Sequence, residues 1–265
     1  KQMIHKGFAL DIDSPIATIT INRPSQLNAI TSEMWQQIPQ IATELQSNDS
    51  VRVVIFQGAG TKAFSAGADI IDFDTTRSTP QLAQKYRQNV DEACDAISSL
   101  TKPTVAAIEG YCLGGGFELA LCMDIRVSSD TAKFGLPAAK RGIAISHHHL
   151  EKLIQVVGHN EANYLLLTGR SIDANRALSL GLVSTITEHG KLYDATAALA
   201  IEIAELSPVS HRFHKQALSD LKRYGGVRGI PKDSLQAIDA TEASNDFIEG
   251  VTSFKEKRDA HFPGN

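Results

Sequence analysis

The first part of the chain alternates between short β-branched segments and segments whose apolar residues recur at helical spacing. Residues 16–22 (IATITIN) alternate apolar and polar side chains, which predicts a half-buried strand, and residues 7–13 are its expected hairpin partner. Residues 31–45 predict a helix with Thr31 as its N-cap. Its apolar positions, spaced three or four apart, are Met34, Ile38, Ile41 and Leu45.

The same alternation continues through the middle of the chain. Further strands are predicted at residues 51–56, 104–108, 125–128 and 182–186, and a long polar helix is predicted at about residues 80–100. Strands that alternate with helices indicate a mixed α/β sheet.

The chain after about residue 192 has a helical pattern throughout. We expect helices at about residues 193–206, 208–224, 233–242 and 248–261, separated by breaks at Ser207-Pro208 and Gly225-Gly226. The predicted organisation is therefore a core over residues 1–192 and a helical subdomain over residues 193–265.

Composition and charge indicate an ordinary soluble protein. Of 265 residues, 42% are hydrophobic and 21% are charged, which argues against disorder. The 26 basic against 30 acidic residues give a net charge of −4, so neither a nucleic acid nor a membrane is an expected partner. The sequence has no apolar run of about 18 residues. Its three cysteines do not have the spacing of a disulfide framework or a thiolate metal site, and we expect a cytoplasmic location.

A triple glycine at a predicted strand-to-helix junction is the first candidate for chemistry. Gly114, Gly115 and Gly116 follow the strand at 104–108 and open a helical pattern. Without side chains, these residues allow a ligand oxygen to reach free N–H groups at the positive end of the helix dipole. This geometry suits an oxyanion. Alternatively, the glycines serve only close packing of the helix on the strand.

A second small-residue loop, residues 64–70 (FSAGADI), also follows a strand. There Gly67 can turn the chain and leave the N–H of Ala68 unpaired. Two donors of this kind, one from each loop, could hold one carbonyl oxygen.

The order and spacing of several motifs resemble the enoyl-CoA hydratase/isomerase (crotonase) superfamily. The resemblance covers nearly the whole chain. Its main segments are 64–69 (FSAGAD), 102–103 (KP), 110–118 (GYCLGGGFE), 124–126 (DIR) and 134–137 (FGLP), together with 23–24 (RP) and 27–29 (LNA).

The resemblance implies a crotonase-like spiral of β-β-α turns with a C-terminal helical region that forms a homotrimer, or a hexamer of paired trimers. It also implies a lyase or isomerase of fatty acid metabolism that acts on an acyl-CoA thioester. The backbone N–H groups of Ala68 and Gly115 would form the oxyanion hole, and Glu118 would be the catalytic carboxylate. No metal or permanently bound cofactor is implied, because CoA enters as part of the substrate.

By the same analogy, CoA would lie along two loops. Gln26 and Leu27 would contact it from one loop, and Ala66, Asp69 and Ile70 from the other. A basic cluster at the C-terminus that includes Lys257 could contact its phosphates from this or a neighbouring subunit, although such a cluster is also typical of a solvated helix face.

The sequence departs from the family pattern at two places. Ala138 occupies the position of the second catalytic carboxylate, directly after Pro137, and an alanine cannot transfer a proton. A few residues later, Ile145-Ser-His-His-His-Leu150 replaces a glycine-rich stretch. Successive helical residues point about 100° apart, so at most two of the three imidazoles can face one pocket. They are either solvated residues of a helix that Ser146 caps, or His147 or His148 is a replacement acid/base.

Three functions follow from these residues. The first is an enoyl-CoA isomerase-like or hydratase-like enzyme that stabilises a thioester enolate and uses Glu118 alone for proton transfer. The alternative is a hydrolase of the same family that uses His147 or His148 to cleave an acyl-CoA thioester or a β-diketone carbon–carbon bond. The third is a catalytically weak binding or scaffold protein.

Overall fold

The computed structural model describes residues 2–265, and its main element is a seven-stranded sheet. The strand order is β1-β2-β3-β4-β6-β8-β11. The first three strands pair antiparallel, and the pairs from β3 onward are parallel. The strands are β1 (Gln2–His5), β2 (Phe8–Asp13), β3 (Ile16–Ile21), β4 (Val53–Gly58), β6 (Thr104–Ile108), β8 (Ile125–Ser129) and β11 (Thr185–Thr187).

A second sheet has four strands in the order β10-β9-β7-β5. Each strand has only three residues, which is too short for an alternating pattern to stand out, and the sequence did not predict any of them. They are β5 (Ala63–Ser65), β7 (Tyr111–Leu113), β9 (Lys133–Gly135) and β10 (Ser171–Asp173).

The chain moves between the two sheets in successive β-β-α units. In each unit one strand joins the large sheet, the next joins the small sheet, and a helix follows; β6, β7 and α4 form one such unit. The predicted mixed α/β architecture is confirmed. The α-helices up to residue 179 are α1 (Ser32–Ser47), α2 (Phe73–Thr76), α3 (Pro80–Ser98), α4 (Gly115–Ala120), α5 (His147–Thr168) and α6 (Ala174–Ser179).

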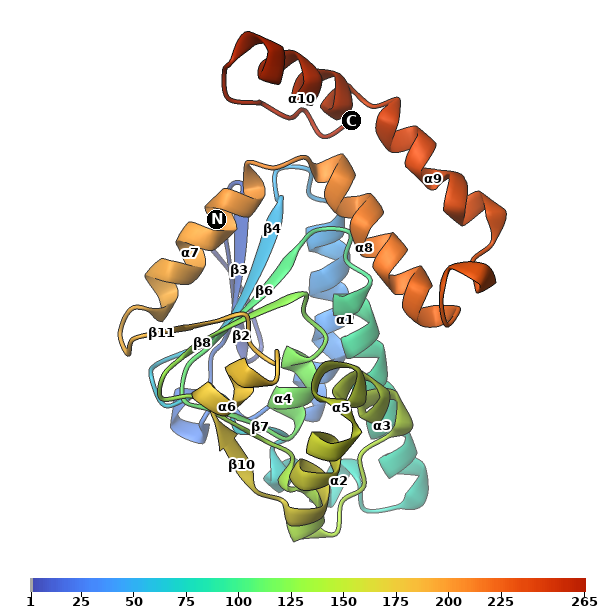
Figure 1. Cartoon of the computed structure of the whole chain (residues 1–265). Coiled ribbons are helices and arrows are strands. Elements are labelled where there is room, and N and C mark those ends of the chain that lie inside the picture. Colours follow the sequence, from blue (N-terminus) through green and yellow to red (C-terminus); the bar gives the residue numbers. More distant parts are fainter. Residues whose placement is uncertain (1) are drawn as a thin grey trace.

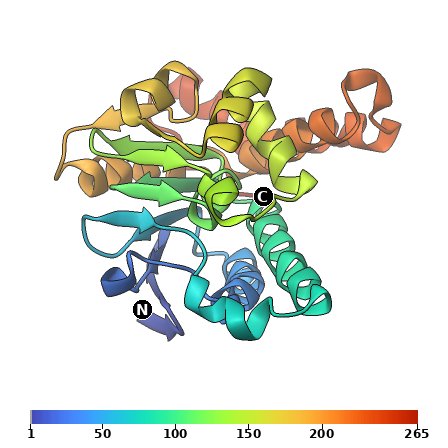
Figure 2. The ribbon, with the colours of Figure 1, turned by 90° about the horizontal axis from the view of Figure 1, so that it is seen from below.

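Helices cover both faces of the large sheet, so its parallel strands are buried on both sides. Ala106 and Ile108 of β6 face the larger core, which includes residues of α1, α3, α4 and α5. Val105 and Ala107 face α7 (Leu192–Ala204) on the other side. Helices α1 and α3 pack side by side, as Figure 2 shows. The side chain of Thr31 accepts a hydrogen bond from the N–H of Met34, which confirms the predicted cap.

The last three helices, α8 (Pro208–Arg223), α9 (Lys232–Glu242) and α10 (Asn245–Glu256), extend away from the sheet layers (Figure 1). Helix α7 packs on the large sheet, so the projecting region begins only with α8. The division at residue 192 remains a prediction. The last helix begins and ends earlier than predicted, because Ser244 caps it and Lys257 ends it in a left-handed conformation.

Candidate active site

A cavity of about 280 Å³ lies where α1, α2, α3, α4 and α5 meet, and we call it the central cavity. Much of its wall is apolar, with a few polar groups among the apolar ones, as is usual for a small-molecule site. The apolar lining includes Trp35, Phe73, Val90, Ile143 and Ile145, and the charged lining consists of Arg77, Arg87, Asp91, Glu118 and Arg141.

The backbones of Ala68 and Gly115 lie next to each other at the wall of this cavity. The amide nitrogen of Ala68 lies 3.4 Å from the point that a Cβ on Gly115 would occupy. Ile30 bridges the residues on either side of Ala68: its N–H donates to Gly67 and its carbonyl accepts from Asp69. Gly115 is the first residue of α4, where an N–H has no intrahelical acceptor. Within residues 2–265, neither N–H donates a backbone hydrogen bond.

The three glycines at this junction have different roles. Gly114 has a φ of 51°, in the left-handed region that favours glycine. Gly116 packs against Ser65, because a Cβ on Gly116 would lie 2.5 Å from the Cβ of Ser65. Close packing therefore explains Gly116, whereas Gly115 lies beside the unpaired N–H of Ala68.

Glu118, one turn into α4, is buried and lines the central cavity. Burial raises the pKa of its carboxyl to about 7, with smaller effects from Cys122 and Asp91 in the same direction and from Arg77 in the opposite direction. Its carboxyl forms no hydrogen bond or ion pair with any other described residue. A carboxyl with a pKa near neutrality can both donate and accept a proton under ordinary conditions.

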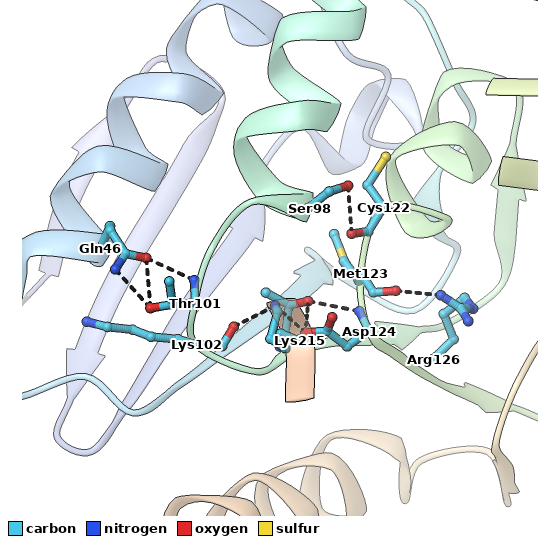
Figure 3. A network of polar contacts seen from close by, with 10 residues as sticks. Gln46, Ser98, Thr101, Lys102, Cys122, Met123, Asp124, Arg126 and Lys215 are labelled. Carbon is cyan, nitrogen blue, oxygen red and sulfur yellow. Dashed lines mark hydrogen bonds and ion pairs between the residues drawn. The ribbon is translucent and has the colours of Figure 1, made fainter. Parts of the chain in front are cut away.

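The C-terminal end of α4 is held by a polar network that Figure 3 shows. The buried guanidinium of Arg126 donates hydrogen bonds to the backbone carbonyl oxygens of Met123 and Ala120. The hydroxyl of Ser98 donates a hydrogen bond to the backbone carbonyl oxygen of Cys122. On the same segment, the carboxylate of Asp124 accepts from Nζ of Lys215 in α8 at 2.6 Å. These contacts attach the end of α4 and the segment that follows it to α3, β8 and α8.

The predicted histidine positions need correction. His147 is exposed, Nε2 of His148 lies 2.9 Å from Oδ1 of Asp95, and neither residue lines the central cavity. His149 is the imidazole at the cavity and is only 4% exposed. The helix begins at His147, and its rotation directs the third histidine inward. Ser146 occupies the predicted N-cap position, but its side chain does not form the capping hydrogen bond.

Asp91 of α3 is a charged cavity residue that the sequence did not indicate, as are Arg77, Arg87 and Arg141. One of its carboxylate oxygens, Oδ1, lies 3.0 Å from Nε2 of His149 and accepts a hydrogen bond from Ser146 at 3.3 Å. Burial lowers the pKa of His149 to about 4, so its imidazole is neutral at pH 7. Asp91 follows the buried Val90 but is itself 35% exposed, and the sequence carried no signal for its place at the cavity. Ala138 also lines the cavity, within the short helix Pro137–Arg141.

The residues predicted to contact CoA fall into two groups. Ala66 and Ile70 line the central cavity. Asp69 lies at the adjoining surface, where its carboxylate contacts Nη1 of Arg23 at 2.8 Å, and Gln26 lines a shallow hollow beside this pair. The carbonyl of Leu27 accepts from the N–H of Ala66, which joins the two loops.

Lys257 is not near these loops in one chain. It ends α10, whereas α2 and α5, which border the cavity, lie at the opposite end of the molecule (Figure 1). Only a neighbouring subunit could bring this residue to the cavity.

Cys94, Cys112 and Cys122 are buried and free. Among residues 2–265, no group of three or more His, Cys, Asp or Glu side chains is arranged to hold a metal ion. None of the helices in that range is sufficiently long and apolar to cross a bilayer.

Comparison with known proteins shows the family to which the chain belongs. The family model described as enoyl-CoA hydratase/isomerase matches residues 11–265. The chain is 31% identical to the short-chain-enoyl-CoA hydratase of Clostridium acetobutylicum over 94% of each protein. It is 30% identical to the crotonyl-CoA hydratase of Syntrophomonas wolfei over 98% of this chain and 99% of that protein. The crystal structure of an enoyl-CoA hydratase/carnithine racemase from Magnetospirillum magneticum covers 100% of this chain and 97% of its own, with a TM-score of 0.94 and 34% identity. The fold is therefore crotonase-like, and the chain belongs to the enoyl-CoA hydratase/isomerase family.

Proposed function

We propose that this protein binds an acyl-CoA thioester in the central cavity and stabilises its enolate with the N–H groups of Ala68 and Gly115. The observation that carries the proposal is the adjacency of these two unpaired donors to a buried carboxyl, Glu118, in one cavity. Donors fixed in advance toward a developing negative charge lower the barrier to enolate formation, and one such donor contributes about 10² to 10³ in rate.

Glu118 moves the proton in this proposal. With a pKa of about 7, its carboxyl can protonate the α-carbon of an enolate or remove a proton from that carbon. The pair of N–H donors and the carboxyl of Glu118 can take part in two reactions, the addition of water to a 2-enoyl thioester and the shift of a double bond. The names of the relatives favour hydration as the first reaction to test.

The substrate would be the only source of CoA, bound along the loops that contain Gln26, Leu27, Ala66, Asp69 and Ile70. The contact between Arg23 and Asp69 supports this placement, because it holds the two loops together beside the cavity. The hydrolase alternative has weaker support, since His147 and His148 do not line the cavity.

A homotrimer is part of the proposal. Large apolar side chains are exposed along α8, α9 and α10, and burial between copies of the chain would remove them from water. Such an assembly would also allow Lys257 of one subunit to approach the CoA loops of another.

The test is hydration of crotonyl-CoA, followed by loss of its conjugated enoyl absorbance, with Glu118→Gln as the matched variant. A thiol reagent in a parallel assay detects free CoA. The proposal expects hydration by the wild type, a loss of at least about 10²-fold in kcat in the variant, and no thiol release. Thiol release that persists in Glu118→Gln would instead favour the hydrolase.

A further inference from the structure

Asp91 and Glu118 are the two carboxylates that line the central cavity, and they enter it from different helices. The Glu118 side chain is buried, whereas that of Asp91 is 35% exposed. The negative charge of Asp91 is among the effects that raise the pKa of Glu118, so the two groups influence each other electrostatically. Two carboxyl groups in different environments of one site can divide the roles of acid and base.

The contacts of Asp91 leave half of its carboxylate free. Ser146 and His149 both approach Oδ1, whereas Oδ2 has no hydrogen-bond partner among residues 2–265. Ser146 donates the hydrogen bond that orients the carboxylate, whereas Nε2 of His149 lies close to Oδ1 without forming a hydrogen bond. Because the imidazole of His149 is neutral at pH 7, it does not cancel the charge of the carboxylate. Asp91 is therefore held on one oxygen and remains available to act as a base through the other.

The position of Asp91 matters because of Ala138. Addition of water to a double bond requires one group to take a proton from water and another to deliver a proton to carbon. The methyl group of Ala138 at the cavity wall can do neither. Asp91 supplies a second carboxylate from α3 instead of from the segment after Pro137.

We propose that Asp91 is the second acid/base residue of this site and that it activates water for addition to a 2-enoyl-CoA thioester. This inference rests on the proposed function and goes further by naming hydration as the reaction. Asp91 takes one proton from water as the water oxygen bonds to the β-carbon and the π electrons move toward the thioester carbonyl. Glu118, in its protonated form, then gives its proton to the α-carbon. A proton passes from Asp91 to Glu118 through solvent, so the net change is the addition of one water molecule.

The helix that carries Asp91 also offers a matched control. Asp95 lies one turn further along α3, and its Oδ1 contacts Nε2 of His148 at 2.9 Å, much as Asp91 contacts His149. Asp95 is 59% exposed and does not line the cavity. Asp91→Asn and Asp95→Asn therefore make the same chemical change in similar contacts, with only one of them at the cavity.

The experiment measures two reactions of the full chain in each variant. The first is hydration of crotonyl-CoA. The second is incorporation of deuterium from D₂O at the α-carbon of butyryl-CoA, which needs the oxyanion hole and Glu118 but no activated water. We expect Asp91→Asn to lower kcat for hydration by about 10²-fold or more, with little change in KM and deuterium exchange within a few-fold of wild type. Asp95→Asn should leave both reactions unchanged.

Two results for Asp91→Asn would overturn the inference. Hydration within threefold of wild type would show that Asp91 is not the base. An equal loss of hydration and deuterium exchange, with unchanged circular dichroism and Tm, would show that Asp91 acts only through Glu118.

The wild type provides two further outcomes. Deuterium exchange without hydration would overturn the role of Asp91 while retaining the proposed enolate chemistry. The absence of both reactions in the wild type would overturn the proposed function and the role of Asp91 together.

Discussion

The amide nitrogen of Ala68 lies 3.4 Å from the point that a β-carbon on Gly115 would occupy. Two chain segments 47 positions apart thus present adjacent unpaired N–H groups, and a methyl group on Gly115 would lie in contact with the nitrogen of Ala68. The added group would also lie 3.1 Å from Cζ2 of Trp35.

Gly115→Ala should therefore reduce activity more than stability. We expect kcat for crotonyl-CoA to fall by about 10²-fold, because a blocked donor no longer stabilises the enolate. Gly116→Ala should have its larger effect on stability, since the new Cβ would meet Ser65 at 2.5 Å. Steady-state kinetics and urea unfolding of both variants check this contrast. Unchanged kcat in Gly115→Ala would rule out this placement of the oxyanion hole.

Glu118 should make the stability of the protein depend on pH. Its pKa is about 7 in the folded chain against 4.5 for an ordinary glutamate. Between these values the unfolded chain releases the proton and the folded chain keeps it, so the free energy of unfolding falls as pH rises from about 4.5 to 7. The penalty, on the order of 3 kcal/mol, is then present at pH 8 and nearly absent at pH 4.5.

Glu118→Gln removes this penalty. The variant should be more stable than the wild type at pH 8 by about 1 to 3 kcal/mol and should show a smaller gain at pH 5. Urea unfolding at the two pH values measures the difference. An equal effect at both would mean that Glu118 keeps an ordinary pKa in the folded protein.

Lys215 links the projecting helices to the core. Its Nζ contacts Asp124 at 2.6 Å and also donates to the carbonyl of Lys102. Lys215→Met should lower the protection of α8 amides from hydrogen exchange, with a loss of about 1 to 3 kcal/mol in local stability. Amides of β6 and β4 should change much less. Uniform loss of protection across the chain would instead mean that α8 and the sheet unfold as one unit.

The exposed apolar residues of the projecting helices should be interface residues. Phe254 is 84% exposed, and Leu218 and Ile248 are 67% and 59% exposed. We expect the wild type to be a trimer or a hexamer by light scattering after size-exclusion chromatography. Phe254→Asp should shift it toward smaller species, because burial of a charge without a partner opposes association. A monomeric wild type would contradict the proposed assembly.

Local patterns were sufficient for much of the fold. Thr31 and the apolar spacing after it predicted α1, and β-branched runs predicted β3 and β6, because these signals depend on neighbours within a few residues. The motif around Glu118 identified the family, since small residues at a strand-to-helix junction serve the same backbone geometry wherever it occurs.

Other features depended on contacts between distant segments. The three-residue strands of the small sheet are paired with strands that are distant in sequence. Which histidine of α5 faces the cavity depends on how that helix packs. The contact of Asp91 with His149 joins residues 58 positions apart. The sequence by itself therefore determined the succession of elements, the glycine loops and Glu118, whose signals are local. Only the tertiary structure placed Asp91 in the same cavity as Glu118, because the packing of helices that are distant in sequence sets which polar side chains line it.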